Sequence, residues 1–117
     1  MITLRKATHD DEALLLRWRN HPQIVKACGI QKPVTEVEHS KWIDKVFDHP
    51  GTWQIYIAER FLDQSYKLPC KPEPVGMGRL EKQGEVAILS YLVDPDQQTG
   101  GYGAQILQEL TTKALLL

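Results

Sequence analysis

Two hydrophobic periodicities divide the chain into segments. Apolar and polar residues alternate along residues 2–7 and 52–61, which predicts two β-strands, and residues 75–84 and 85–94 resemble the two strands of a hairpin. Between and after these segments, apolar residues recur every three or four positions, which predicts amphipathic helices. The expected order of elements is strand, helix, helix, three strands and a final helix.

The first predicted helix has a start signal and a stop signal. Thr8 followed by Asp11 resembles a capping box in which Asp replaces the usual Glu, and residues 20–22 (NHP) end the pattern. The apolar stripe of this helix consists of Leu14, Leu15 and Trp18. We expect the stripe to face a core.

Two further helical segments are expected before the second strand. Residues 21–30 form a short helical turn that Gly29 ends, and residues 35–48 form a longer amphipathic helix. The residues predicted to share one face of the longer helix are Val37, Trp42, Ile43 and Val46.

The second half of the chain predicts a hairpin and a last helix. Residues 62–74 contain three prolines without periodicity and are predicted to be a surface loop. Residues 75–84 and 85–94 pair around Gly84, and the second of these strands is apolar on both faces, as expected for a buried strand. The apolar stripe of the last helix consists of Ile106, Leu107, Leu110, Ala114 and Leu117.

This order of elements predicts an α/β fold with a mixed sheet and helices packed against it, formed by a single domain over residues 1–117. The last helix has no Gly, Asn or Pro stop signal, so we expect further structure after it.

Composition limits the classes of partner and site. Lys and Arg total 14 against 15 for Asp and Glu, so the chain has no net positive charge that would attract nucleic acid or an anionic membrane. No apolar segment approaches a membrane span and the N-terminus lacks a signal peptide pattern, so a cytoplasmic location is expected. Cys28 and Cys70 are expected to be reduced, and the scattered histidines predict no metal site.

A glycine turn joins the last strand to the last helix. Gly100, Gly101 and Gly103 can expose several backbone N–H groups, and a helix that begins there directs further N–H groups and a partial positive charge to the same place. Such a turn binds a phosphate or pyrophosphate. A Walker loop is excluded because Ala104 and Gln105 follow the last glycine, and Ile106 stands where a dinucleotide fingerprint needs glycine.

Residues 98–103 (QTGGYG) resemble the Q/R-x-x-G-x-G/A signature of the GCN5-related N-acetyltransferase (GNAT) family. Residues 90–103 also resemble the family's fourth strand, Asp-Pro corner and pyrophosphate loop in one run, and residues 2–22 resemble its first strand and helix. The resemblance implies an acyl-CoA N-acyltransferase-like fold that is incomplete at its C-terminus, with acetyl-CoA as co-substrate and no metal.

The resemblance also implies a place for each part of coenzyme A. Backbone groups of Leu92 and Val93 would meet the pantetheine arm. Amides of the following residues would face the pyrophosphate: Gln98, Thr99, Gly100, Gly101, Tyr102, Gly103 and Ala104.

The catalytic residues are left unassigned by the sequence. Ile88 stands where the family often carries an acid, and the nearest carboxylates, Glu81 and Glu85, fit solvated strand ends equally well. The family's general acid is often a Tyr beyond a fifth strand, and Tyr91 and Tyr102 do not match that position.

Four residues are candidates for the acceptor side. Trp18, Arg19 and Asn20 end the first helix in a segment similar to the branch of the family that acetylates ribosomal proteins and nucleotide-linked amino sugars. Trp53 offers a ring for stacking. The alternatives are packing for Trp18, Trp42 and Trp53, and a favourable helix-dipole contact for Arg19.

The sequence therefore predicts an N-acetyltransferase that moves acetyl from acetyl-CoA to a primary amine. The expected acceptor is a small molecule such as a nucleotide-linked amino sugar, and a protein N-terminal amine is the next candidate. A catalytically silent CoA-binding or interaction domain is the alternative. We also expect these 117 residues alone to turn over poorly and to self-associate through an exposed edge of the strand at 85–94.

Overall fold

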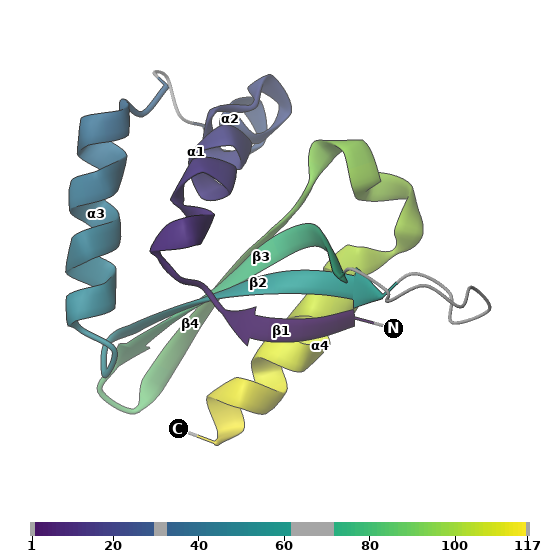
Figure 1. The fold of residues 1–117 in the computed structure, drawn as a ribbon. Helices are drawn as coiled ribbons and strands as arrows, with labels where there is room; N and C mark the ends of the chain where they lie inside the picture. Colours follow the sequence, from purple (N-terminus) through teal and green to yellow (C-terminus); the bar gives the residue numbers. More distant parts are fainter. Residues whose placement is uncertain (1, 30–32, 62–71, 117) are drawn as a thin grey trace.

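The computed structural model describes residues 2–29, 33–61 and 72–116 (Figure 1). Its centre is a four-stranded sheet in the order β1-β2-β3-β4, and every described pair of neighbouring strands is antiparallel. The strands are β1 (Ile2–Lys6), β2 (Trp53–Phe61), β3 (Pro72–Gln83) and β4 (Val86–Val93). The predicted α/β fold with helices packed against a sheet is confirmed, but the described strands are all antiparallel, where a mixed sheet was expected.

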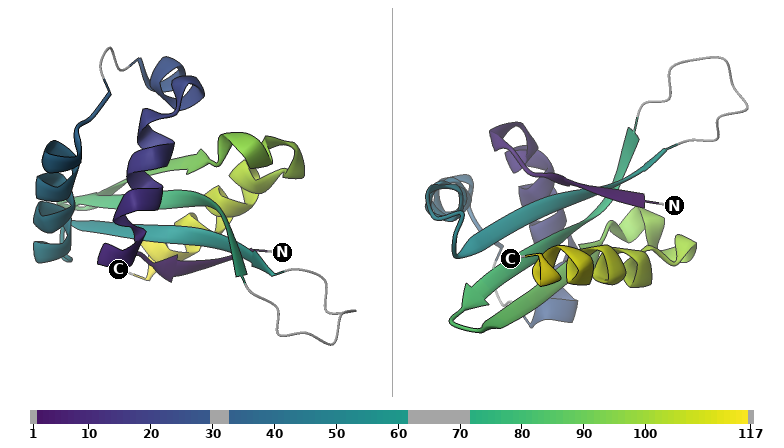
Figure 2. Two further views of the ribbon diagram at one scale, coloured as in Figure 1. Left: turned by 45° about the horizontal axis from the view of Figure 1, so that its top comes forward. Right: turned by 90° about the horizontal axis from the view of Figure 1, so that it is seen from below.

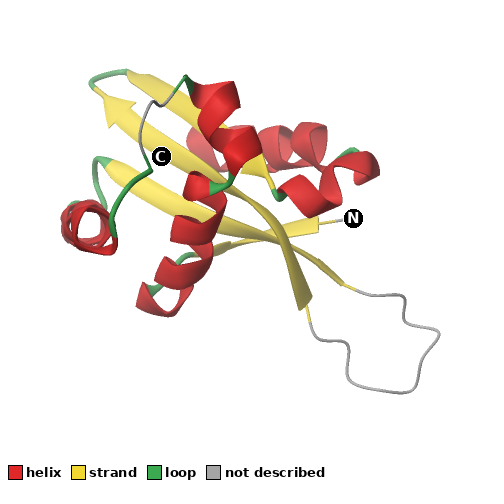
Figure 3. Ribbon diagram, turned by 90° about the horizontal axis from the view of Figure 1, so that it is seen from above, coloured by secondary structure: helices red, strands yellow, loops and turns green. Residues whose placement is uncertain are grey.

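Helices cover both faces of the sheet (Figures 1 and 2). The bounds of the helices are α1 (Glu12–Asn20), α2 (Pro22–Cys28), α3 (Glu36–Asp48) and α4 (Tyr102–Leu115), with short 3-10 helices η1 (His9–Asp11) and η2 (Pro95–Gly100). The first three helices lie on one side and α4 on the other, as the view from above also shows (Figure 3).

The predicted helix signals are present in the structure. The Thr8 hydroxyl accepts from the Asp10 amide while Asp11 accepts from the Thr8 amide at 2.8 Å, so the first helical segment starts with a capping box. Gly29 ends α2 in the left-handed conformation, at φ 69°, which glycine adopts without strain. The side chain of Thr35 caps α3.

Each face of the sheet has its own buried cluster. On the side of α1 and α3, Leu15, Trp18, Ile43 and Val46 pack with Ile55 and Ile57 of β2. On the other side, α4 buries Ile106 and Leu110 completely against the sheet. Strand periodicity explains this division, because successive side chains of a strand point to opposite faces.

Three predictions about apolar faces are wrong. Val37 is 65% exposed, and the neighbouring buried side chain on α3 is His39 instead. The strand β4 is not buried: it lies at the edge of the sheet, and Val86 is 62% exposed. An edge strand has a neighbour on one side only, so apolar composition alone did not reveal its place. Leu107 of α4 is also partly exposed, at 39%.

The last three residues of the predicted loop at 62–74 belong to a strand instead. β3 already begins at Pro72, and Pro74 pairs with Glu59 where the register between β2 and β3 shifts, a place where a sheet tolerates proline. Residues 62–71 of the predicted loop, which include Cys70, lie outside the described residues, as does Leu117. None of the helices in the described ranges is long and apolar enough to cross a bilayer.

Candidate functional site

The chain turns sharply where β4 ends. The Asp94 amide donates to the Val75 carbonyl of β3 at 2.8 Å, and the Asp94 side chain accepts from the Asp96 amide at 2.8 Å. These two bonds end the strand and start η2, which leads to Gly101. Gly101 has φ 70° and is the residue before α4, so the predicted glycine turn enters a helix as expected.

The described residues provide no side-chain cap for the N-terminus of α4. Its first amides, from Tyr102, Gly103 and Ala104, are therefore available to a ligand at the positive end of a 14-residue helix. A Cβ atom added to Gly103 would stand 3.3 Å from the Tyr91 ring, closer than side chains usually approach. Glycine thus lets the start of α4 lie directly against β4, and this geometry suits a pyrophosphate on the amides.

Side chains outside the turn hold the start of α4. Arg60 of β2 donates to the Tyr102 hydroxyl at 2.9 Å and forms an ion pair with Glu73 at 2.7 Å. Glu73 in turn accepts from the Gln97 side chain at 2.9 Å. These contacts raise the pKa of Arg60, through Glu73 first and Tyr102 second. The turn is therefore tied to β2 and β3 from both of its ends.

The free edge of β4 presents backbone groups next to this turn. Pairs in an antiparallel ladder alternate between bonded and non-bonded, and Asp94 is bonded to β3. Counting back in the register, Tyr91 and Val93 direct their amides away from β3, whereas Leu92 directs its amide toward it. Of the two residues predicted to meet pantetheine, Val93 thus has the outward amide.

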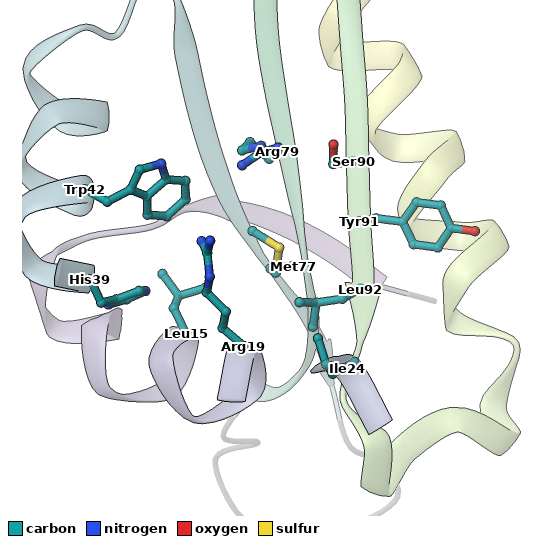
Figure 4. Close-up of a pocket in the computed structure, with 10 residues that line it drawn as sticks. All are labelled: Leu15, Arg19, Ile24, His39, Trp42, Met77, Arg79, Ser90, Tyr91 and Leu92. Carbon is teal, nitrogen blue, oxygen red and sulfur yellow. The ribbon is translucent and has the colours of Figure 1, made fainter. Parts of the chain in front are cut away.

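A cavity of about 310 Å³ lies between the helices α1, α2 and α3 and the strands β3 and β4 (Figure 4). Its wall is mostly apolar. The lining residues are Leu15, Arg19, Ile24, His39, Trp42, Met77, Arg79, Ser90, Tyr91 and Leu92. Figure 4 shows that the Tyr91 ring points away from the cavity, toward α4. The cavity and the glycine turn therefore meet along the same strand, β4.

Three groups give the cavity its electrostatic character. The guanidinium carbons of Arg19 and Arg79 lie 5.3 and 5.8 Å from the centre of the Trp42 ring system, within the range of cation-π contacts. Burial lowers the pKa of His39, and the charge of Arg19 lowers it further, while Glu12 opposes them. His39 is therefore neutral at pH 7 and adds no charge to the cavity.

Only one of the four predicted acceptor residues lines this cavity, namely Arg19. The Asn20 side chain instead exchanges two hydrogen bonds of 2.8 Å with the backbone of Val34, which fixes the approach to α3. Trp18 is 2% exposed and belongs to the core, in agreement with the packing alternative. Trp53 lines a separate hollow of about 210 Å³ beside α3.

Sequence reasoning missed three residues of the cavity wall. Trp42 was assigned to packing, and His39 and Arg79 were not singled out. A signal for Arg79 existed: it lies two positions after Met77, on the strand face that also carries inward apolar residues. A charged residue on such a face indicates a site.

Among the described residues, no carboxylate lines the cavity. Ile88 is 40% exposed and lies directly opposite Glu81 of β3 in the register, while Glu85 lies in the turn before β4. The general base thus stays unassigned. At the surface, ligand atoms of His9, Glu12 and Asp44 come within 4.8 Å of one another, where His9 and Glu12 already share a 3.2 Å contact.

The fold and the glycine turn define the acyl-CoA N-acyltransferase-like class. The sequence profile of the acetyltransferase (GNAT) domain matches residues 1–116. The chain belongs to the GNAT family. A search of curated proteins gave no match.

Solved structures with the same fold include enzymes with coenzyme A. A spermidine N-acetyltransferase from Vibrio cholerae in complex with CoA and spermine gives a TM-score of 0.79 at 15% identity, over 99% of this chain and 64% of that one. A domain from Methanocaldococcus jannaschii gives 0.74 at 23% identity, over 98% and 70%. An aminoglycoside acetyltransferase in complex with coenzyme A gives 0.72 at 21%, over 98% and 68%.

These identities are low, so the likeness establishes the fold and not the substrate. The chain spans slightly less than two thirds of the length of the Vibrio cholerae enzyme.

Proposed function

We propose that this protein transfers the acetyl group of acetyl-CoA to a primary amine. One observation carries the proposal: a 14-residue helix without a side-chain cap among the described residues starts at a glycine turn, which η2 connects to the end of β4, in a chain of the GNAT family. Such a helix start binds the pyrophosphate of a nucleotide through backbone amides and the helix dipole. The CoA complexes of proteins with the same fold support this donor.

The donor would lie along the edge of β4. In this proposal the amides of residues 98–104 bind the pyrophosphate, and the backbone of Leu92 and Val93 runs beside the pantetheine arm. The outward amides of Tyr91 and Val93 are the groups that the register offers for hydrogen bonds. The thioester would then reach the cavity that Ser90 and Leu92 line.

The chemistry requires a neutral amine. The amine nitrogen forms a bond to the thioester carbonyl carbon, the carbon-sulfur bond breaks, and the proton that the nitrogen loses balances the proton that the leaving thiolate takes up. A backbone N–H on β4 that donates to the carbonyl oxygen stabilises the negative charge that develops there. Deprotonation at pH 7 costs about 4.6 kcal/mol for a lysine-like amine and about 1.4 kcal/mol for an α-amine. An acceptor with a weakly basic amine is therefore favoured.

A small nucleotide-linked amino sugar is the acceptor that we propose first, and a protein N-terminal amine is the second. Arg19 supports the first choice, because its guanidinium lines the cavity and can bind a phosphate or a sugar hydroxyl. Trp42 adds an aromatic surface on which a planar base can stack.

A silent CoA-binding domain is the alternative function. It is favoured by one observation: no carboxylate lines the cavity, so the described residues offer no acidic general base there. Such a domain would bind CoA without releasing its thiol.

A turnover screen distinguishes these two functions. Acetyl-CoA would be mixed with the protein and a panel of amines that includes amino sugars, their nucleotide-linked forms, polyamines and short peptides. Free thiol release shows turnover, and mass spectrometry identifies the acetylated amine. We expect thiol release with at least one amine. Calorimetric binding of CoA without any thiol release across the panel would instead support the silent domain.

A further inference from the structure

Two guanidinium groups in the cavity have no described carboxylate partner. Arg19 comes from the last turn of α1 and Arg79 from β3, and both reach toward Trp42 (Figure 4). Neither arginine forms an ion pair with a described residue, whereas Arg5 and Arg60 both form ion pairs with carboxylates. The Nε atom of Arg19 is also buried without a hydrogen-bond partner among the described residues.

The groups around the arginines do not neutralise them. His39 is neutral at pH 7, and none of the lining residues is Asp or Glu. Glu81 stands two positions from Arg79 on the same strand face, and Glu12 lies near His39, but neither forms an ion pair with Arg19 or Arg79. A partly enclosed site with unneutralised positive charge is stabilised when it binds an anion.

The donor's phosphates do not explain this charge. Arg79 pairs with Ser90, and the strand continues from Ser90 for three more residues before the turn that leads to α4 begins. At about 3.3 Å per residue, the pyrophosphate turn therefore begins roughly 10 Å further along the strand. The arginines lie on the cavity side of β3 and β4, whereas α4 lies against the opposite face.

We propose that Arg19 and Arg79 bind an oxyanion, either a carboxylate or a phosphate, that the acceptor amine itself carries. A guanidinium group binds such oxyanions through two parallel N–H donors, which fixes the orientation of the acceptor. The rest of the acceptor then lies against Trp42 and the apolar wall. The inference rests on the proposed acetyl transfer and defines its substrate class, from which polycationic amines are excluded by like charge.

Matched pairs of acceptors test this inference. One pair is glucosamine 6-phosphate and glucosamine, and the other is phenylalanine and phenylalaninamide. In at least one pair, the member that carries the carboxylate or phosphate, called here the anionic member, should have a kcat/KM at least about tenfold higher than the member without it. The pair that shows the preference identifies the oxyanion. The result is informative because the amine of phenylalaninamide is the weaker base and would otherwise react faster.

Variants show whether the arginines cause the preference. Arg79→Gln and Arg19→Gln should each reduce the ratio of the two kcat/KM values toward one, while the affinity for CoA stays unchanged. Arg79→Lys should keep part of the preference, because lysine supplies the charge without the two parallel donors. Arg17→Gln, which removes an exposed arginine from the same helix, is the control and should keep the ratio. An unchanged ratio in Arg79→Gln overturns the inference.

A binding measurement separates this inference from the proposed function. Calorimetry with glucosamine 6-phosphate, glucosamine, phenylalanine and phenylalaninamide should detect binding of an anionic member only, and the binding should be lost in Arg79→Gln. Selective binding without turnover supports the oxyanion site and contradicts acetyl transfer. Turnover without any preference for the anionic members supports acetyl transfer and overturns the oxyanion site. Absence of selective binding and of preference also overturns it.

Discussion

Arg5 connects the first strand to the first helical segment. Its guanidinium pairs with Asp11 at 2.8 Å and with Glu59 of β2 at 3.1 Å, and Asp11 also accepts from the Thr8 amide at 2.8 Å. Asp11 is 6% exposed, so its charge depends on these partners. The hydrogen bond from Arg5 holds the pKa of Asp11 below its usual range against the opposing effect of burial.

Replacing Asp11 tests this contact through stability. Asp11→Asn should lower the free energy of unfolding by about 1–3 kcal/mol at pH 7, because a charged hydrogen-bond network is lost. A lowered pKa stabilises the fold above the carboxyl's unfolded pKa near 3.8, and this stability disappears as pH falls through the folded pKa. Urea unfolding should thus show a difference between the variant and the natural chain that shrinks as the pH is lowered below 3.8. Asp10→Asn, an exposed neighbour, is the control, and an equal loss in both variants contradicts the account.

Individual residues were predictable where their role is local. The Thr8 and Asp11 cap follows from three-residue spacing, and the glycine turn follows from adjacent residues. The bond between Asn20 and Val34 joins residues 14 positions apart, and the gathering of Arg79 with Trp42 depends on how a helix lies over a strand. Hydrophobic periodicity does not predict such contacts between elements that are far apart in the sequence.

Two glycines of β3 let α4 approach the sheet. A Cβ atom on Gly78 would stand 3.1 Å from Leu110, and one on Gly76 would stand 2.8 Å from Ile106 and press on the Leu92 carbonyl oxygen. Ile106 and Leu110 are both fully buried. The small size of the two glycines therefore sets the distance between α4 and the strands that frame the proposed donor site.

A methyl group at Gly76 should therefore destabilise the fold. We expect Gly76→Ala to lower the free energy of unfolding by about 1–3 kcal/mol, because the core has no room for the added atom. Gly51→Ala is the matched control, since nothing lies within 4 Å of a Cβ atom there. Thermal denaturation of the two variants gives the comparison. Equal melting temperatures would show that α4 shifts without cost.

Elements were predicted well from periodicity and less well at sheet edges. The predicted helix at 35–48 corresponds to α3, and the hairpin around Gly84 corresponds to β3 and β4. The exposed edge of β4 was predicted, but the exposure of the Val37 and Val86 side chains was not, because an apolar residue does not show in the sequence whether a neighbour covers it.

At the scale of the whole molecule, β4 contributes to both proposed binding sites. The glycine turn for the donor follows its end, and the cavity for the acceptor lies on the face opposite α4. The same strand has a free edge, and Val86 and Ile88 are exposed on it. An apolar strand edge of this kind invites pairing with a second copy.

Self-association of these 117 residues therefore remains our prediction. Light scattering should detect a dimer or larger species, and Val86→Lys should shift it toward monomer, because a lysine at a strand edge opposes pairing. Val37→Lys is the control, since Val37 is exposed to a similar extent, 65% against 62%, but lies on α3. A monomeric natural chain contradicts the prediction.

The central claim is that CoA binds at the start of α4, and one pair of variants tests it by calorimetry. Ala104→Glu puts a negative charge in the first turn, where it favours the helix but repels the pyrophosphate. Gln108→Glu adds the same charge at an exposed position one helical turn after Ala104. We predict that Ala104→Glu weakens CoA binding at least about tenfold without lowering the melting temperature, and that Gln108→Glu keeps most of the affinity. Equal CoA affinity in the natural chain and in Ala104→Glu would contradict the claim.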